Sequence, residues 1–262
     1  MPWLGAPPSR CLQEGFRARA PKAADQAKFS NTFCAEWVDF EGEWVDRISV
    51  FESREDAGRR LGRWLNERAV EADLILGLPR GGVVVAAEVA DILNRPLDVL
   101  IVRKIGHPLQ REFALGALAE GGVVVLDDEA IGGEWMVRNE LERVIAEEQD
   151  RLKSYQLRFS RGGAAAIASK VVLLVDDGLA TGATTEAAVR SAIKQGAREV
   201  FVTAPVGSSH AVKRLERVAD RVEVMCVDPE FNAVGRYYDN FPQTTDDEVL
   251  ALLNTHLTGS KA

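Results

Sequence analysis

The chain has 262 residues, 46% of them hydrophobic and 27% charged, which is the balance of a soluble globular protein. Its net charge of −8 at pH 7 argues against a general nucleic-acid binder. A run of about 18 apolar residues, which would predict a membrane span, does not occur, and the first residues lack the apolar segment of a signal peptide. We therefore expect a cytoplasmic protein without a membrane anchor.

Residues 1–45 differ in composition from the rest of the chain. They contain four prolines and scattered small and basic residues that follow no period. This predicts a poorly ordered N-terminal extension, followed by one domain over residues 46–262. Basic residues outnumber acidic ones in part of this segment, so an organelle-targeting segment is the alternative, although no amphipathic stripe supports it.

The first regular elements form a strand, a glycine loop and a helix. A helix is expected after Ser53, which is a good N-cap. The apolar run 73–78 predicts a buried strand, and it leads through Pro79-Arg80-Gly81-Gly82 into a helical pattern over 83–93. By itself this loop is equally well explained as an ordinary turn in which glycine serves the backbone.

Two cations and a loop follow in the predicted order of elements. Residues 97–102 read as one strand closed by Arg103 and Lys104, at the sheet edge where open α/β proteins bind ligands; a solvated surface pair is the alternative. Residues 106–112 predict a mobile loop, plausible as a lid. The amphipathic pattern over 134–155 predicts a packing helix, with a homodimer contact as the alternative.

A second strand, glycine loop and helix follow at residues 171–193. Five consecutive valines and leucines predict a strand buried on both faces, and the adjacent acids Asp176 and Asp177 stand at its end. Small residues then lead into a helix, and the start of a helix attracts anions through its N–H groups and dipole. Because carboxylates accept hydrogen bonds from sugar hydroxyls or hold a divalent cation, the pattern indicates a site for a phosphorylated sugar.

The remaining elements continue the alternation. Strands are expected over 199–206 and 221–227, and helices over 211–219 and 246–257. The alternation predicts an α/β fold, a Rossmann-like, mostly parallel sheet with helices on both faces.

The stretch Asp176 to Thr184 closely resembles the phosphoribosyl diphosphate motif of type I phosphoribosyltransferases, and the resemblance extends over roughly residues 50 to 250. The chain looks most like the stand-alone phosphoribosyltransferases whose substrates have not been assigned. The resemblance implies that Asp176 and Asp177 bind the ribose hydroxyls, directly or through Mg²⁺. It also implies a 5-phosphate site in the following loop, made by Ala180, Thr181, Gly182, Ala183 and Thr184.

The same resemblance implies where the diphosphate is held. Arg80-Gly81-Gly82 matches the family's diphosphate-binding loop, which often contains a strained or cis peptide. Arg103 and Lys104 match basic residues that reach the diphosphate, and residues 107–112 fall at the family's flexible catalytic loop. Arg80, Arg103 and Lys104 are therefore the expected catalytic residues, because they would stabilise the leaving diphosphate.

The acceptor is left open. The 6-oxopurine enzymes of this family carry a third acid where this chain has Ala180, which argues against hypoxanthine or guanine but leaves adenine, orotate or another base or amine. Aromatic and amide side chains near the C-terminus are candidates to contact a base, although packing of the C-terminal segment is the simpler explanation. They are Phe231, Asn232, Tyr237, Tyr238 and Phe241.

Other function classes fit less well. A regulatory module that binds phosphoribosyl diphosphate or a nucleotide without turnover is the main alternative. A dinucleotide-binding oxidoreductase is disfavoured because the chain has no G-x-G-x-x-G, and a P-loop kinase because it has no Gly-Lys-Ser/Thr.

Overall fold

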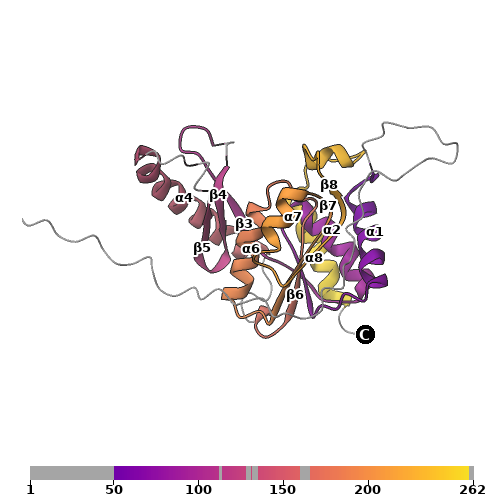
Figure 1. The fold of residues 1–262 in the computed structure, drawn as a ribbon. Coiled ribbons are helices and arrows are strands. Elements are labelled where there is room, and N and C mark those ends of the chain that lie inside the picture. The colour runs from indigo at the N-terminus through magenta and orange to yellow at the C-terminus, as the bar shows by residue number, and fades with distance from the viewer. Residues whose placement is uncertain (1–49, 112–113, 128–130, 132–134, 160–165, 260–262) are drawn as a thin grey trace, which may run out of the picture.

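A computed structural model describes residues 50–111, 114–127, 131, 135–159 and 166–259 (Figure 1). The expected N-terminal extension, residues 1–45, lies outside this part of the chain. Its order, and the domain boundary at residue 46, therefore stay predictions.

The main sheet is parallel and confirms the predicted fold class. Its strand order is β2-β1-β6-β7-β8, and every neighbouring pair runs parallel. All five residues of the central strand β6 are buried, because helices cover both faces of the sheet. The strands are β1 (Leu74–Gly77), β2 (Leu97–Val99), β6 (Val171–Val175), β7 (Glu199–Ser208) and β8 (Arg221–Asp228).

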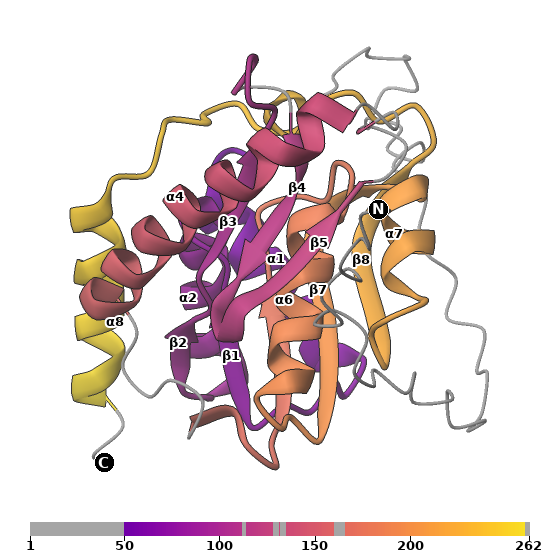
Figure 2. The same cartoon turned by 90° about the vertical axis from the view of Figure 1, so that its left-hand side faces the viewer.

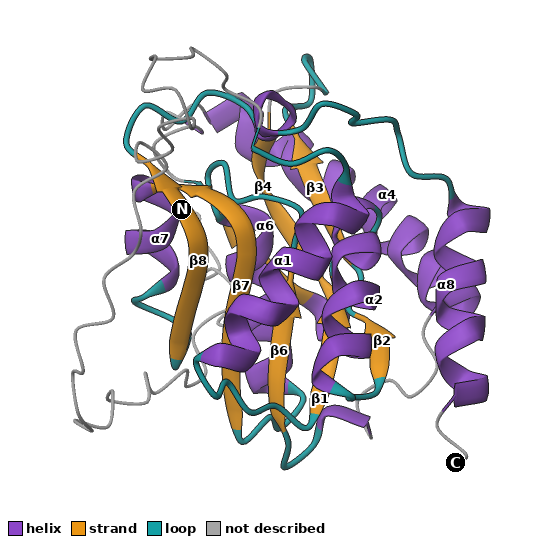
Figure 3. Ribbon diagram, turned by 90° about the vertical axis from the view of Figure 1, so that its right-hand side faces the viewer, coloured by secondary structure: helices purple, strands orange, loops and turns teal. Residues whose placement is uncertain are grey.

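Helices cover the two faces of this sheet. One face carries α1 (Arg54–Glu67) and α2 (Gly81–Leu93), which lie in front of the strands in Figure 3. The other face carries α6 (Ala183–Lys194) and α7 (Ser209–Leu215), and α8 (Asp246–Gly259) packs beside α2 and β2. The predicted N-cap is confirmed, since the Ser53 hydroxyl accepts a hydrogen bond from the Asp56 backbone N–H at 3.3 Å.

A smaller antiparallel sheet stands beside the main one. It has the order β3-β4-β5, and the long helix α4 (Trp135–Phe159) packs across β3 and β4 (Figure 2). Leu141, Val144 and Leu152 of α4 are buried, as its predicted stripe requires, whereas a dimer contact through α4 stays a prediction. The strands are β3 (Val102–Gly106), β4 (Ala114–Ala119) and β5 (Val123–Leu126), with the short 3-10 helix η1 (Glu120–Gly122) between β4 and β5.

The prediction of one strand over residues 97–102 was wrong. The chain leaves the parallel sheet after Val99 and starts β3 at Val102, so Arg103 and Lys104 lie inside the smaller sheet. Glu120 holds the break: its buried carboxylate accepts a hydrogen bond from the Ile101 N–H at 2.8 Å, and its own N–H donates to the Ile101 carbonyl at 3.2 Å. The run 97–102 is apolar apart from Asp98 and so conceals this change of sheet, because Glu120, which holds the break, is 19 residues from Ile101.

In the described part of the chain, no helix is both long and apolar enough to cross a membrane. The C-terminal segment between β8 and α8 has little regular structure beyond the 3-10 helix η2 (Val234–Tyr237), as its sequence predicts.

Helices α1 and α2 approach each other closely at Gly58. A Cβ at this position would lie 2.8 Å from the Val85 carbonyl oxygen and 2.8 Å from the Glu88 Cβ. We expect Gly58→Ala to lower the free energy of unfolding by about 1 kcal/mol or more, because overpacking against backbone outweighs the gain in helix propensity. Urea denaturation measures it. Asn66→Ala, at an exposed position of the same helix, should change stability by less than about 0.5 kcal/mol, and equal effects of the two changes would contradict the prediction.

Candidate functional site

The two glycine loops seen in the sequence meet at the carboxyl end of the parallel sheet. A Cβ on Gly82 would lie 2.9 Å from the Asp176 Cα, and one on Gly81 would lie 2.0 Å from the Asp177 Oδ2. Only glycine lets the backbones come this close. The peptide bond Pro79-Arg80 at the start of this loop is cis, as the resemblance suggested. The structure thus brings together Asp176, Asp177, Gly81 and Gly82.

Asp176 is partly buried at the end of β6. Its Oδ1 accepts a hydrogen bond from the Asp177 N–H at 2.9 Å, and its Oδ2 lies 3.4 Å from the donating Thr185 hydroxyl. Burial raises the pKa of Asp176 to about 8, and the negative charge of Asp177 contributes in the same direction, while Lys104 partly opposes both. The surroundings therefore compensate the ionised form of Asp176 poorly and favour its protonated form.

Asp177 has a cation of its own. Its Oδ2 accepts a hydrogen bond from the Arg54 Nε at 2.7 Å, and the two side chains are only 16% and 10% exposed. The Tyr238 hydroxyl donates to the Asp177 backbone carbonyl at 2.6 Å. Sequence reasoning missed Arg54. The one signal was a cation in the first turn of a helix, where the dipole disfavours it.

The loop between the acid pair and α6 is open to solvent at Ala180 and Thr181. Gly182 adopts a left-handed conformation, with φ 73°, directly before α6 begins at Ala183. The Ser208 hydroxyl fixes the loop by donating to the Ala180 carbonyl at 2.6 Å, and the Thr181 hydroxyl accepts from the Ala183 N–H at 3.4 Å. The first N–H groups of α6, from Ala183 and Thr184 onwards, lack partners within the helix, as an anion site requires.

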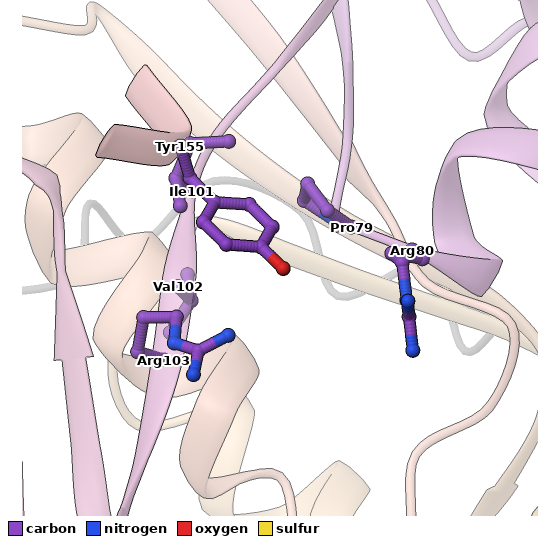
Figure 4. Close-up of a pocket in the computed structure, with 6 residues that line it drawn as sticks. All are labelled: Pro79, Arg80, Ile101, Val102, Arg103 and Tyr155. Carbon is purple, nitrogen blue, oxygen red and sulfur yellow. The ribbon is translucent and has the colours of Figure 1, made fainter. Parts of the chain in front are cut away.

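Two of the predicted cations face one cavity of about 300 Å³. In Figure 4 the guanidinium groups of Arg80 and Arg103 and the Tyr155 hydroxyl border the same space. Arg103 is fixed by Glu148 of α4, at 2.9 Å from its Nε, whereas Arg80 has a looser partner in Asp246 of α8, at 3.7 Å. The remaining lining residues are Pro79, Ile101 and Val102.

A second cavity, of about 350 Å³, is lined by residues of β3 and α4. Lys104 borders it and is exposed, and Arg111 lies at its edge with Nη2 3.0 Å from Glu147 Oε2. Arg111 belongs to the loop after β3 that the sequence identified as a candidate lid. Glu112 lies outside the described residues, so the motion of this loop stays a prediction.

The C-terminal aromatic residues mainly pack against one another. Tyr237 and Tyr238 are buried, with ring centroids 5.3 Å from Phe231 and 4.9 Å from Phe241 respectively. The Tyr237 hydroxyl donates to Asp228. Packing thus accounts for the two tyrosines, while Asn232 and Phe241 are exposed.

Comparison with known proteins identifies the family of this chain. Residues 45–240 match the phosphoribosyl transferase domain family, and the chain belongs to it.

Two proteins from strains of Mycobacterium tuberculosis, provisionally named phosphoribosyl transferases, are each 42% identical over 208 residues, which is 79% of this chain and 47% of theirs. The chain thus spans about half the length of these relatives. The crystal structure of TT1426 from Thermus thermophilus is 44% identical, covers 78% of this chain and 97% of its own, and superposes with a TM-score of 0.63.

The raised pKa of Asp176 predicts how stability depends on pH. The folded protein binds this proton more tightly than the unfolded chain, whose Asp pKa is 3.8, so stability should fall as pH rises from about 4 towards about 8. The slope from this group is at most about 1.4 kcal/mol per pH unit. Urea denaturation at several pH values should show a flatter profile for Asp176→Asn. Glu142→Gln, at an exposed position of α4, is the control and should keep the wild-type profile; the prediction fails if Asp176→Asn leaves the profile unchanged.

Proposed function

We propose that this protein is a phosphoribosyltransferase that uses 5-phosphoribosyl 1-diphosphate as donor, transfers the phosphoribosyl group to a base or amine still to be identified, and releases diphosphate. The observation that carries the proposal is the contact between Gly81 and the Asp177 carboxylate. It sets the acid pair, which would bind the ribose, directly beside the loop that would hold the diphosphate. The helix start of α6 lies next to both. Membership in the phosphoribosyl transferase family supports the same conclusion.

The chemistry follows from where charge develops. When the bond from C1 to the diphosphate breaks, the ribose becomes oxocarbenium-like and the leaving group gains negative charge. Arg80 and Arg103 face one cavity, and Lys104 follows Arg103 in β3 and borders the second cavity. The positive charges of these three residues would stabilise the departing diphosphate. Asp176 and Asp177 would hold the ribose hydroxyls. A loop closed over the site would exclude water and favour the acceptor over hydrolysis.

Magnesium fits the acid pair. Mg²⁺ usually binds one or two carboxylates and completes its coordination shell with phosphate oxygens and water. The described residues contain no cluster of three or more possible metal ligands, and such a cluster is not needed for this ion. The raised pKa of Asp176 supports a cation there, because the carboxylate lacks sufficient compensating charge. Asp176 and Asp177 would hold the ion, which would neutralise charge on the bound diphosphate.

A regulatory module that binds the donor without turnover is the alternative. The observation that favours this alternative is the ion pair between Arg103 and Glu148. Glu148 partly neutralises the positive charge that would stabilise the leaving diphosphate. A cytoplasmic location, the absence of nucleic-acid and membrane partners, and a homodimer are further parts of the proposal that rest on sequence reasoning alone.

We expect Mg²⁺-dependent binding of 5-phosphoribosyl 1-diphosphate, measurable by calorimetry. Asp176→Asn combined with Asp177→Asn should weaken it by at least about a hundredfold, because each change removes a charged acceptor for the ribose hydroxyls or the ion. Glu142→Gln with Asp150→Asn removes the same charge from exposed positions on α4 and should leave binding unchanged. If the wild type and the variant with Asp176→Asn and Asp177→Asn bind the donor with equal affinity, the assignment of the donor site is wrong.

Turnover is a separate expectation. Diphosphate release should be measured with a panel of purine and pyrimidine bases and amines, and for the accepted compound Lys104→Met should lower kcat by about a hundredfold or more. Lys153→Met, at an exposed position of α4, serves as the control. Donor binding without release for any acceptor would instead establish the regulatory module.

A further inference from the structure

Among the described residues, Arg54 is the one cation in direct contact with the acid pair. It stands at the first position of α1, and its Nε is 2.7 Å from the Asp177 Oδ2 and would be 2.7 Å from a Cβ on Gly81. The guanidinium therefore lies at the junction of the acid pair and the diphosphate loop.

The position of Arg54 is unfavourable unless the cation has a partner. A positive charge in the first turn of a helix opposes the helix dipole, and Arg54 is buried, with 8% of its surface exposed. Burying a guanidinium without a paired carboxylate is strongly unfavourable. The pairing with Asp177 offsets both effects, and it joins two residues that are 123 positions apart.

The C-terminal segment holds Arg54 from the other side. The Arg54 Nη1 donates to the Pro242 carbonyl at 2.6 Å, and the guanidinium carbon lies 3.7 Å above the Phe241 ring. Backbone hydrogen bonds tie this segment to the chain before α1, from Asp239 to Phe51 at 2.8 Å and from Asn240 to Glu52 at 3.0 Å. Arg54 therefore has few alternative conformations and fixes the carboxylate that it binds.

We propose that Arg54 is a positioning residue of the donor site, which orients the Asp177 carboxylate for the ribose hydroxyls. This inference rests on the proposed function. Arg54 acts through Asp177, because its Nε and Nη1 are engaged by Asp177 and Pro242. Loss of a group that orients a binding carboxylate usually weakens binding or activity by about 10- to 100-fold.

The test measures the affinity of the full chain for two probes by calorimetry, 5-phosphoribosyl 1-diphosphate with Mg²⁺ and inorganic diphosphate with Mg²⁺. Arg54→Gln should weaken the first by about 10- to 100-fold and leave the second within about threefold. Arg54→Lys should restore part of the affinity, since it keeps the charge but not the planar fork. Arg59→Gln, an exposed arginine of the same helix, should match the wild type.

A double-variant cycle separates positioning from direct binding. If Arg54 acts through Asp177, adding Arg54→Gln to Asp177→Asn should cause no further loss. Additive losses, or an equal loss of affinity for diphosphate alone, would overturn the proposal and make Arg54 a diphosphate ligand. Thermal unfolding checks that each variant folds. If Arg54→Gln does not fold, the test uses Arg54→Lys instead. A folded Arg54→Lys with unchanged donor affinity overturns the proposal, whereas a loss of affinity confined to 5-phosphoribosyl 1-diphosphate supports it.

The outcomes also separate this inference from the proposed function. A wild type that binds inorganic diphosphate but not the phosphoribosyl donor overturns the proposed function, and the inference with it. A wild type that binds the donor, together with Arg54→Gln of equal affinity, overturns the inference alone.

Discussion

The close approach of the backbones at Gly81 and Gly82 to the end of β6 is the constraint on which the site depends. Two loops that are about 95 residues apart in the chain come within van der Waals distance, because neither glycine has a side chain to separate them. The parallel order of β1 and β6 places their carboxyl ends at one edge of the sheet. The helices α2 and α6 start there as well, so their N–H groups and dipoles add to one anion-attracting edge.

Charges around this edge are balanced by residues from elements outside the parallel sheet. Glu148 of α4 accepts from Arg103, and Arg151 of the same helix contacts the other oxygen of that carboxylate at 2.6 Å. Asp246 of α8 lies near Arg80 and is itself bound by Arg158 of α4 at 2.7 Å. The long helix α4 thus orients both cavity-facing arginines, one directly and one through α8. Glu148 stands within the packing stripe of α4, four residues after Val144 and four before Leu152, and it is buried there.

Prediction from sequence succeeded where the determinants are local. Strand β6, the acid pair after it and the start of α6 follow one another within 13 residues, from Val171 to Ala183, and each has a direct sequence signal. It failed where a distant residue decides the local structure. The break between β2 and β3 depends on Glu120, and the environment of Asp177 depends on Arg54 and Tyr238. None of these three partners stands near its target in the chain, so no short window of sequence contains both members of a pair.

The two adjacent acids have different surroundings, and this difference bears on the proposed chemistry. Asp177 has a buried cation within hydrogen-bond distance, so its charge is compensated before any ligand arrives. Among the described residues, Asp176 accepts hydrogen bonds from the Asp177 N–H and the Thr185 hydroxyl, Lys104 acts at longer range, and burial raises its pKa. A divalent cation or the hydroxyls of a sugar would therefore gain more at Asp176 than at Asp177. In the proposed reaction, the fold already fixes the Asp177 carboxylate through Arg54, whereas the bound donor and its metal ion would compensate the charge of Asp176.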